Sequence, residues 1–215
     1  MTIVHHPSEA LLMDFAAGSL GQARSLVIAA HIHACPHCQD MVEAAEAAGG
    51  ALLEDLPPSE MGPDALELAM ARIERPAPGP IETPALAPAQ PADWIRVPVE
   101  VREAVRHKRW VAPGVWVAPI RQGHGEPLSY LLRVGPGMRM PLHTHEGTEL
   151  TLILKGAFQD GDAVFGPGDV AEADDHTEHS PHILPGGECV CLVACDNRLV
   201  VRDWLGRIVQ TYAGI

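Results

Sequence analysis

The chain contains no run of eighteen apolar residues, and its first fifteen residues lack a basic start followed by an apolar stretch and a small-residue cleavage site. These absences argue against a transmembrane helix and a secretory signal, so we expect a cytoplasmic protein. Lysine and arginine are also scarce, because 15 basic residues face 28 acidic ones, for a net charge of -13. Direct binding to nucleic acid needs a basic surface, so we expect no nucleic-acid partner.

Cysteine is scarce as well, with five residues at positions 35, 38, 189, 191 and 195. An odd number in two clusters does not make a disulfide framework, and it is typical of metal ligands or free thiols in a reducing compartment. Aromatic residues make up only 4% of the chain and apolar residues 47%, which is the composition of an ordinary folded protein.

The negative charge is concentrated near the N-terminus. Residues 1–75 contain 11 Asp and Glu against 3 Arg, a balance of -8, whereas residues 76–215 contain 17 acidic and 12 basic residues, a balance of -5. Such a segment is either a solvated surface or the complement of a partner with a basic face.

The pattern of apolar residues divides the chain into two parts. Residues 8–18, 20–35, 38–56 and 63–74 carry apolar residues at helical spacing, with Ser8 as the expected N-cap of the first helix. A proline-rich segment, 76–93, reads as a linker. After it come short β-like runs separated by glycine-rich turns, which predict an all-β sandwich or barrel. We therefore predict an α+β multidomain protein with a four-helix module over 1–75 and a β domain over 94–215.

The first cluster of chemically reactive side chains is "HIHACPHC", residues 31–38. On one continuous helix, His31, Cys35 and Cys38 would share a face and could converge on an ion. Two thiolates and an imidazole suit tetrahedral zinc, and either His5 or His6 could supply a fourth ligand. The alternatives are disulfide exchange by Cys-x-x-Cys without metal, or unliganded core residues. His33 and His37 do not share the face of all three ligands, so we expect them to be bystanders.

The second cluster is "HTHEGTE", residues 143–149. His143 and His145 are two apart, so on a strand both point to the same side, and a tight turn brings Glu149 on the next strand toward the same point. The segment "GDVAEADDHTEHSPH" offers a third histidine from across a barrel. Three imidazoles and a carboxylate suit zinc, manganese or ferrous iron, so the ligand set predicts a metal site without naming the metal.

The two clusters together resemble a known family. His-x-His-x3-Glu between Gly137 and Gly156 is similar to cupin motif 1, and residues 161–179 resemble a degenerate cupin motif 2 whose usual spacing from glycine to histidine is not kept. The "HH" pair followed by "HIHACPHC" resembles the zinc-binding anti-sigma domain. This order of domains, together with "CVCLVA" near the end, resembles ChrR-type anti-sigma factors over nearly the full length.

The resemblance implies the ligand sets. The helical module would be a small zinc-binding anti-sigma bundle, and the β domain a cupin, a jelly-roll barrel. Cys189 and Cys191 match a family cysteine pair near the cupin site, whereas no role can be assigned to Cys195. The implied ligands are His6, His31, Cys35 and Cys38 for the N-terminal zinc, and His143, His145, Glu149 and His179, rather than His176, for a cupin zinc or other divalent metal.

The resemblance also implies the function. The helical module would bind a group IV extracytoplasmic-function sigma factor, and the cupin would sense singlet oxygen or organic hydroperoxide and trigger its release. The protein would then not be an enzyme. The main alternative is a cupin dioxygenase or isomerase with a helical oligomerisation module, but a small-molecule enzyme has no use for the first cluster and the acidic N-terminal part. A cupin transcription factor is disfavoured because no basic recognition helix is present.

Overall fold

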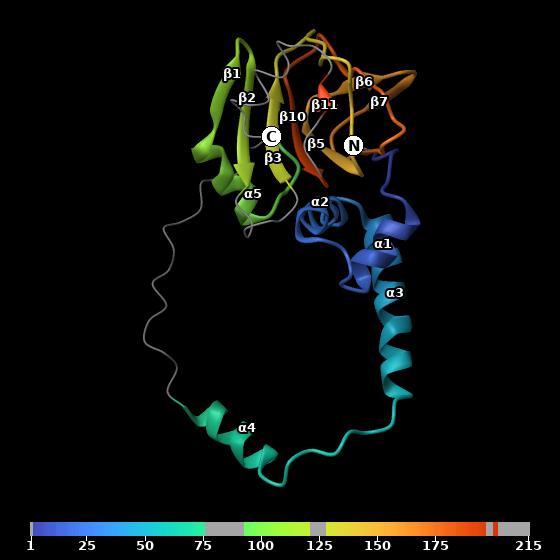
Figure 1. Cartoon of the computed structure of the whole chain (residues 1–215), viewed down its shortest axis with the longest axis vertical. Helices are drawn as coiled ribbons and strands as arrows, with labels where there is room; N and C mark the ends of the chain where they lie inside the picture. Colours follow the sequence, from blue (N-terminus) through green and yellow to red (C-terminus); the bar gives the residue numbers. More distant parts are fainter. Residues whose placement is uncertain (1, 76–92, 121–127, 197–199, 202–215) are drawn as a thin grey trace.

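The structure is a computed structural model that describes residues 2–75, 93–120, 128–196 and 200–201. Its N-terminal part is helical, as the apolar spacing predicts, and the remainder is mainly β (Figure 1). Ser8 occupies the N-cap position of the first helix, although its side chain makes no capping hydrogen bond. The four N-terminal helices are α1 (Glu9–Ala16), α2 (Gln22–Ile32), α3 (Pro36–Glu54) and α4 (Ala65–Glu74).

The first cluster does not lie on one continuous helix, which corrects the geometry assumed from its spacing. α2 ends at Ile32, and α3 begins at Pro36 with Cys35 in an extended conformation at the N-cap. Proline has no N–H to donate to the preceding turn and disfavours the helical conformation of the residue before it. Two helices joined by a short turn therefore replace the single helix, and Pro36 is the first residue of the second one.

The β part forms an antiparallel cupin, so the predicted fold class is confirmed. It opens with two short helical segments that the sequence pattern did not indicate, α5 (Val99–Ala104) and η1 (Val105–His107). The main sheet has six strands in the order β1-β2-β3-β10-β5-β8, a second sheet pairs β7, β6 and β9, and β11 pairs with β4. The strands are β1 (Arg109–Ala112), β2 (Val115–Ile120), β3 (Leu128–Val134), β4 (His143–Thr144), β5 (Glu149–Lys155), β6 (Phe158–Asp160), β7 (Ala163–Phe165), β8 (Val170–Ala173), β9 (His182–Ile183), β10 (Cys189–Cys195) and β11 (Val200–Val201).

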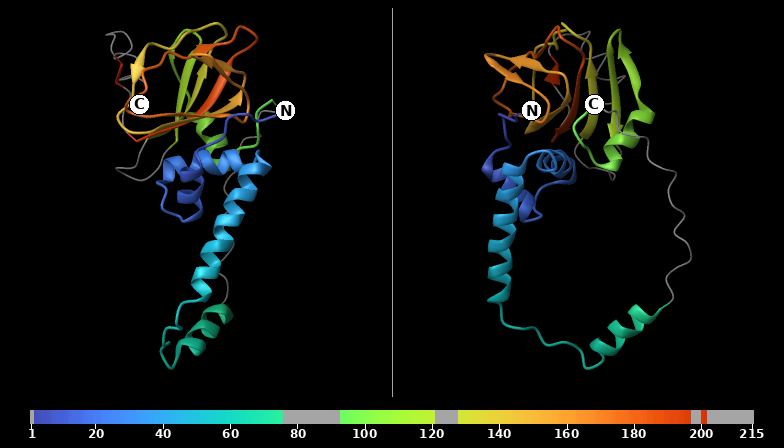
Figure 2. Two further views of the ribbon diagram at one scale, coloured as in Figure 1. Left: turned by 90° about the vertical axis from the view of Figure 1, so that its right-hand side faces the viewer. Right: turned by 180° about the vertical axis from the view of Figure 1, so that it is seen from behind.

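The main sheet is covered on both faces. Leu150, Leu152 and Leu154 of β5 are buried in one hydrophobic cluster with Val27 and Ile28 of α2. Ile153 points to the opposite face and belongs to a second cluster inside the barrel. Because successive residues of a strand alternate between faces, a strand that is buried on both faces is apolar almost throughout, as the neighbouring β10 is. α2 packs beneath this sheet, and Figure 2 shows α1 and the start of α3 next to α2, with the rest of α3 projecting away from the cupin. The helices and the cupin therefore share one core, although the predicted boundary separates them in sequence.

The fourth helix does not join the bundle. None of the α4 side chains is buried, and the helix lies apart from the rest of the described chain (Figure 1). The preceding segment contains Pro57 and Pro58 and is exposed, so nothing folds α4 back onto α3. The apolar residues that made this helix predictable from sequence are therefore available to a partner.

The proline-rich linker predicted over 76–93 lies outside the described residues, except for Asp93, whose carboxylate is 2.6 Å from the Lys155 ammonium. Within the described ranges no helix is both long and apolar enough to cross a lipid bilayer.

Candidate metal sites

Four side chains of the helical part converge on one point. His6 precedes α1, His31 lies in the last turn of α2, Cys35 caps α3, and Cys38 lies in the first turn of α3. One potential ligand atom from each residue lies within 4.8 Å of all the others. His31 and Cys38 are completely buried, whereas His6 is exposed at the edge of the cluster. Both histidines that could have been the fourth ligand are in the described chain, and the structure brings His6 to the cluster.

The distances in this cluster fit a tetrahedral ion. Nδ1 of His6 lies 3.4 Å from Sγ of both Cys35 and Cys38, and Nε2 of His31 lies 3.3 Å from Sγ of Cys38. Sulfur and nitrogen ligands of one tetrahedral zinc ion are roughly 3.5 Å apart, given the usual bond lengths. Nδ1–H of His31 donates to the carbonyl oxygen of Gly168 at 2.9 Å, so Nε2 carries the free lone pair that faces the thiols.

Burial sets the protonation of these ligands. Desolvation, followed by the charge and hydrogen bond of Cys35, raises the pKa of Cys38 to about 12. Desolvation also lowers the pKa of His31, which keeps its imidazole neutral near pH 7. A metal that binds here must displace the Cys38 proton, so we expect binding to weaken as the pH falls.

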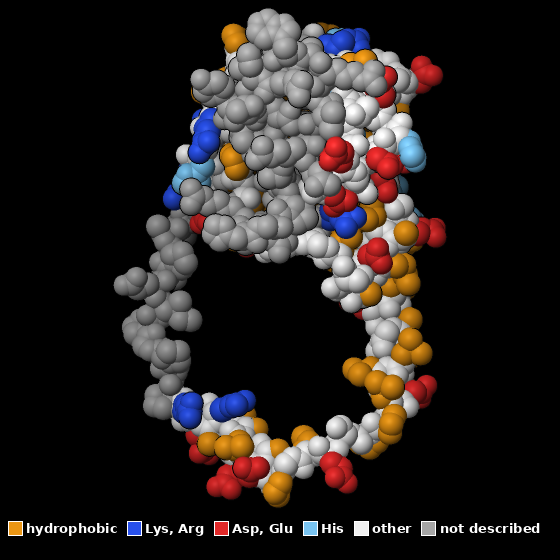
Figure 3. Space-filling model, viewed as in Figure 1, with side chains coloured by type: hydrophobic (Ala, Val, Ile, Leu, Met, Phe, Trp, Pro, Cys, Tyr) orange, Lys and Arg blue, Asp and Glu red, His pale blue; other side chains and the backbone are white. Residues whose placement is uncertain are grey.

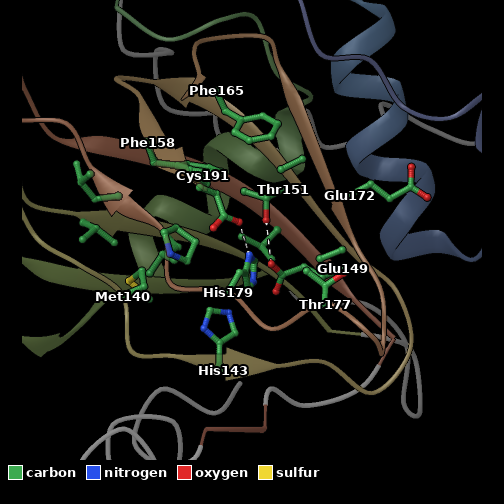
Figure 4. Close-up of a pocket in the computed structure, with 18 of the residues that line it drawn as sticks. Met140, His143, Glu149, Thr151, Phe158, Phe165, Glu172, Thr177, His179 and Cys191 are labelled. Carbon is green, nitrogen blue, oxygen red and sulfur yellow. Dashed lines mark hydrogen bonds and ion pairs between the residues drawn. The ribbon is translucent and has the colours of Figure 1, made fainter. Parts of the chain in front are cut away.

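The second group lies at the mouth of the cupin barrel. His143 is on β4, Glu149 begins β5, and His179 forms a backbone bridge with His143. A potential ligand atom from each of these residues and His145 lies within 4.8 Å of the other three. Figure 4 shows His143, His179 and Glu149 pointing toward one another at one end of a pocket. The fourth candidate histidine, His176, is 87% exposed at its side chain and contacts Asp175, away from the group.

The hydrogen bonds of His143 and His179 use Nδ1 of each ring and leave Nε2 free to bind a metal. Nδ1–H of His143 donates to the carbonyl oxygen of Pro141 at 2.7 Å, and Nδ1–H of His179 donates to Oδ2 of Asp160 at 2.6 Å. Nε2 of each ring therefore has a lone pair for a metal. Nε2 of His145 lies 2.8 Å from Nε2 of His179, a separation that two ligands of one cation would have.

The electrostatics of this group also suit a cation. Burial, and then the neighbouring His143 and His179, lower the pKa of His145 to about 4, so this imidazole is neutral at pH 7. Burial raises the pKa of Glu149, while His143 and the donors Cys195 and Thr151 oppose that shift. A divalent ion would favour the charged form of this buried carboxylate, which is otherwise costly to desolvate.

The sequence reasoning missed two residues of this site. Asp160 orients His179. The sequence hints at this role only by placing an acidic residue at the end of a β-like run, directly before Gly161. Sγ–H of Cys195, to which no role could be given from sequence, donates to Oε2 of Glu149 at 3.2 Å. The pair Cys189 and Cys191 is buried, with 3.5 Å between the sulfur atoms.

Asp160→Asn is expected to weaken metal binding at the cupin group by about 10- to 100-fold, because carboxylates that orient a histidine ligand typically contribute that much. The measurement is zinc competition against a chromophoric chelator, carried out with Cys35 and Cys38 already replaced by serine so that only the cupin group is followed. Asp162→Asn is the matched control, since Asp162 is exposed and only two residues away. Equal zinc affinity in both variants would contradict the role given to Asp160.

Comparisons with known proteins cover the whole chain. Residues 99–197 match the family described as the ChrR cupin-like domain. The anti-sigma-E factor ChrR of Cereibacter sphaeroides is 39% identical over 218 residues, which is 99% of this chain and 99% of that protein. The crystal structure of Rhodobacter sphaeroides SigE in complex with the anti-sigma ChrR matches with a TM-score of 0.73 and 40% identity, covering 91% of this chain and all of that one. The chain therefore belongs to the ChrR family of anti-sigma factors.

Proposed function

We propose that this protein is an anti-sigma factor that sequesters a group IV extracytoplasmic-function sigma factor through its helical part. The support is the match along almost the whole chain to an anti-sigma factor, and the similarity to the ChrR chain in a complex with SigE. That relative is a regulator, so this chain is a regulatory protein and not an enzyme. A sigma factor works with RNA polymerase, so the site of action would be the cytoplasm.

The helical part offers an apolar surface for such a partner. Leu66, Met70 and Ile73 of α4 are 72%, 47% and 76% exposed, and their spacing places them on one side of the helix. Leu52 and Leu53 near the end of α3 are also exposed. Figure 3 shows apolar side chains along the extended part of the molecule, interspersed with acidic ones. Exposed apolar helices of this kind are stable binding elements only when a partner covers them.

The charge of the helical part is complementary to the proposed partner. Residues 1–75 carry a balance of -8, and α4 itself contains Glu67 and Glu74 beside its apolar stripe. A sigma factor must present basic surface to DNA. Electrostatic potentials of opposite sign on two binding surfaces accelerate association, and they favour a basic partner over acidic competitors. The acidic segment would therefore both attract the sigma factor and cover surface that it needs for promoter DNA.

The metal in the helical part would be structural. The four candidate ligands come from three separate segments, and zinc bound to two thiolates and two imidazoles leaves no open position for chemistry. Zinc would fix the N-terminal segment to the α2–α3 turn and so define the shape of the surface that the sigma factor meets.

The cupin would be the sensor of oxidative stress, either singlet oxygen or organic hydroperoxide. Its metal group opens onto a pocket with apolar walls that include Met140, Phe158, Phe165 and Cys191 (Figure 4). Such a pocket can admit a small apolar oxidant to the imidazoles and the metal. The hydrogen bond with Cys189, and then burial, raise the pKa of Cys191, so at rest it is a protonated thiol and a weak nucleophile. The metal group is thus a better first target than the cysteines.

Replacement of Glu149 by alanine is expected to leave resting repression intact and to blunt induction, because the carboxylate belongs to the sensor and not to the sigma-binding surface. The measurement is a sigma-dependent reporter in cells with and without an organic hydroperoxide, and we expect induction to fall at least several-fold. Thr177→Ala, which changes the same pocket without removing a candidate ligand, is the control. Full induction in the Glu149 variant would exclude the cupin metal group as the sensor.

The proposal as a whole is tested by capture of sigma factors. The full chain is immobilised, cytoplasmic extract is passed over it, and bound proteins are identified by mass spectrometry, with metal content measured on the same sample. Retention of an extracytoplasmic-function sigma factor, and two metal ions per chain, are the expected results. Failure to retain any sigma factor while iron or manganese fills the cupin would favour a cupin oxygenase instead.

A further inference from the structure

One turn of the cupin lies against the helical metal cluster. This turn, residues 166–169, connects β7 to β8 and is closed by two hydrogen bonds: Gly166 N–H donates to Oδ2 of Asp169, and Asp169 N–H donates to the carbonyl oxygen of Gly166. Gly168 has a φ of +91°, a conformation that favours glycine. Asp169 is only 4% exposed although it carries a carboxylate. A buried carboxylate in a tight turn needs donors, and it finds most of them outside the turn.

The donors come from the N-terminal arm of the chain, residues 4–6. Val4 N–H and His5 N–H donate to Oδ1 of Asp169 at 2.7 and 3.0 Å. Val170 N–H donates in return to the carbonyl oxygen of His5 at 3.1 Å. The arm therefore lies along the outer edge of β8, which has β5 as its neighbour on the other side. His6 follows directly, so the position of its imidazole depends on this attachment.

The same turn holds a second ligand. The carbonyl oxygen of Gly168 accepts the Nδ1–H of His31 at 2.9 Å, and His31 is completely buried. This hydrogen bond fixes both the orientation of the ring and the tautomer that leaves Nε2 free. Two consecutive residues of the cupin turn thus act on two of the four candidate ligands of the helical site: Asp169 on the arm that carries His6, and Gly168 on the ring of His31.

The turn is also tied to the strand that carries a cupin ligand. Gly168 N–H donates to the carbonyl oxygen of Ile153 at 2.8 Å, and Ile153 N–H donates to the carbonyl oxygen of Asp169 at 3.0 Å. Ile153 and Glu149 are four residues apart on β5, or roughly 13 Å along the strand. Glu149 in turn pairs with Ala173 at the far end of β8. The antiparallel pair of β5 and β8 therefore has the cupin metal group at one end. At its other end lies the turn that contacts the ligands of the helical metal cluster.

We propose that the turn formed by Gly168 and Asp169 is the positioning element of the helical metal site, and that it mechanically couples this site to the cupin. The inference rests on the proposed metal binding, and it deepens the proposed function by naming the contact through which a change in the cupin reaches the sigma-binding part. Neither residue touches the metal. Asp169 acts through the arm that carries His6, and Gly168 acts through the ring of His31.

The test is cobalt binding to the full chain after removal of metal. Cobalt bound to Cys35 and Cys38 gives an intense thiolate charge-transfer absorption, and a Cys35→Ser sample identifies which part of the spectrum belongs to this site. Asp169→Ala removes the acceptor of both arm N–H groups, and we expect the dissociation constant for cobalt at this site to rise by about 10- to 100-fold. Asp169→Asn keeps an acceptor oxygen and should restore most of the affinity. Asp162→Asn is the control for loss of an exposed acidic group.

A second variant leaves the cupin untouched. Val4→Pro removes one of the N–H donors to Asp169 from an exposed residue of the arm, and it should weaken cobalt binding in the same direction, with altered visible ligand-field bands. If both Asp169→Ala and Val4→Pro bind cobalt within two-fold of the unmodified chain and with the same spectrum, the inference is overturned while the metal site stands. If the unmodified chain shows no thiolate absorption, the proposed helical metal site itself is wrong.

Discussion

Replacing Cys35 and Cys38 together by serine is expected to remove zinc from the helical site and to lower the affinity for the sigma factor by at least about 100-fold, or about 2.7 kcal/mol. Zinc bound by two thiolates and two imidazoles contributes on the order of 10 kcal/mol or more to the order of small domains. Without zinc, these segments keep the backbone hydrogen bond from Cys35 N–H to the carbonyl oxygen of His31, their shared hydrophobic cluster, and the contacts of the N-terminal arm with the cupin. The four ligand side chains would, however, no longer be tied to one point.

The measurement is isothermal titration or surface capture with the purified sigma factor, with zinc counted by elemental analysis. His33→Ala is the matched control, because His33 lies in the same segment, is exposed and is not part of the cluster. We expect that control to keep its zinc and its affinity. If the double serine variant has lost its zinc yet binds the sigma factor with full affinity, the helical site is not a structural requirement for sequestration.

Ile73→Asp in α4 is expected to lower sigma affinity by about 100-fold without loss of metal or of thermal stability. Substitution of a residue at the centre of an interface costs about 2 kcal/mol or more when that residue is one of the few that dominate binding, and we expect Ile73 to be such a residue. No α4 side chain is buried in this chain, so the substitution removes nothing from its own core. The expected separation of binding from stability is what distinguishes a docking helix from a structural one.

Ala71→Asp is the matched control for that experiment. It adds the same charge to the same helix, at a position that the helical spacing places away from the stripe formed by Leu66, Met70 and Ile73. Both variants are compared by sigma binding and by thermal melting of the free protein. Equal losses of affinity in the two variants would mean that added charge, and not the apolar stripe, determines the effect. An unchanged affinity for Ile73→Asp would remove α4 from the interface.

The shared core between helices and cupin gives these predictions a common physical basis. Side chains of α2 and of β5 belong to one hydrophobic cluster, so the helical part, with its candidate metal cluster, is held to the outer face of the cupin sheet. The docking helix α4 stands outside that core. A change that starts in the barrel can therefore reach α2 and the N-terminal arm through packed side chains and strand pairing, whereas α4 has no buried side chain through which to receive it.

The sequence by itself determined the local features of this protein. Spacing of apolar residues gave the four N-terminal helices, and turn residues between short apolar runs gave the β domain. Motif spacing pointed to both clusters, because ligands that are two to four residues apart in sequence stay close together whether the backbone forms a helix, a strand or a turn. The spacing could not show that Pro36 would split the first cluster between two helices.

Only the tertiary structure decided what depends on segments that are distant in sequence. It brings His6 to a cluster 25 residues or more away, and it places His179 rather than the exposed His176 beside His143. It also brings Asp160 within hydrogen-bonding distance of His179, and it brings the Gly168–Asp169 turn into contact with His31 and with the arm that carries His6. These contacts join residues up to 165 positions apart, and no local propensity or periodicity encodes them. They follow from the way in which the helices pack on the sheet, which is set by the whole set of buried side chains and not by any one motif.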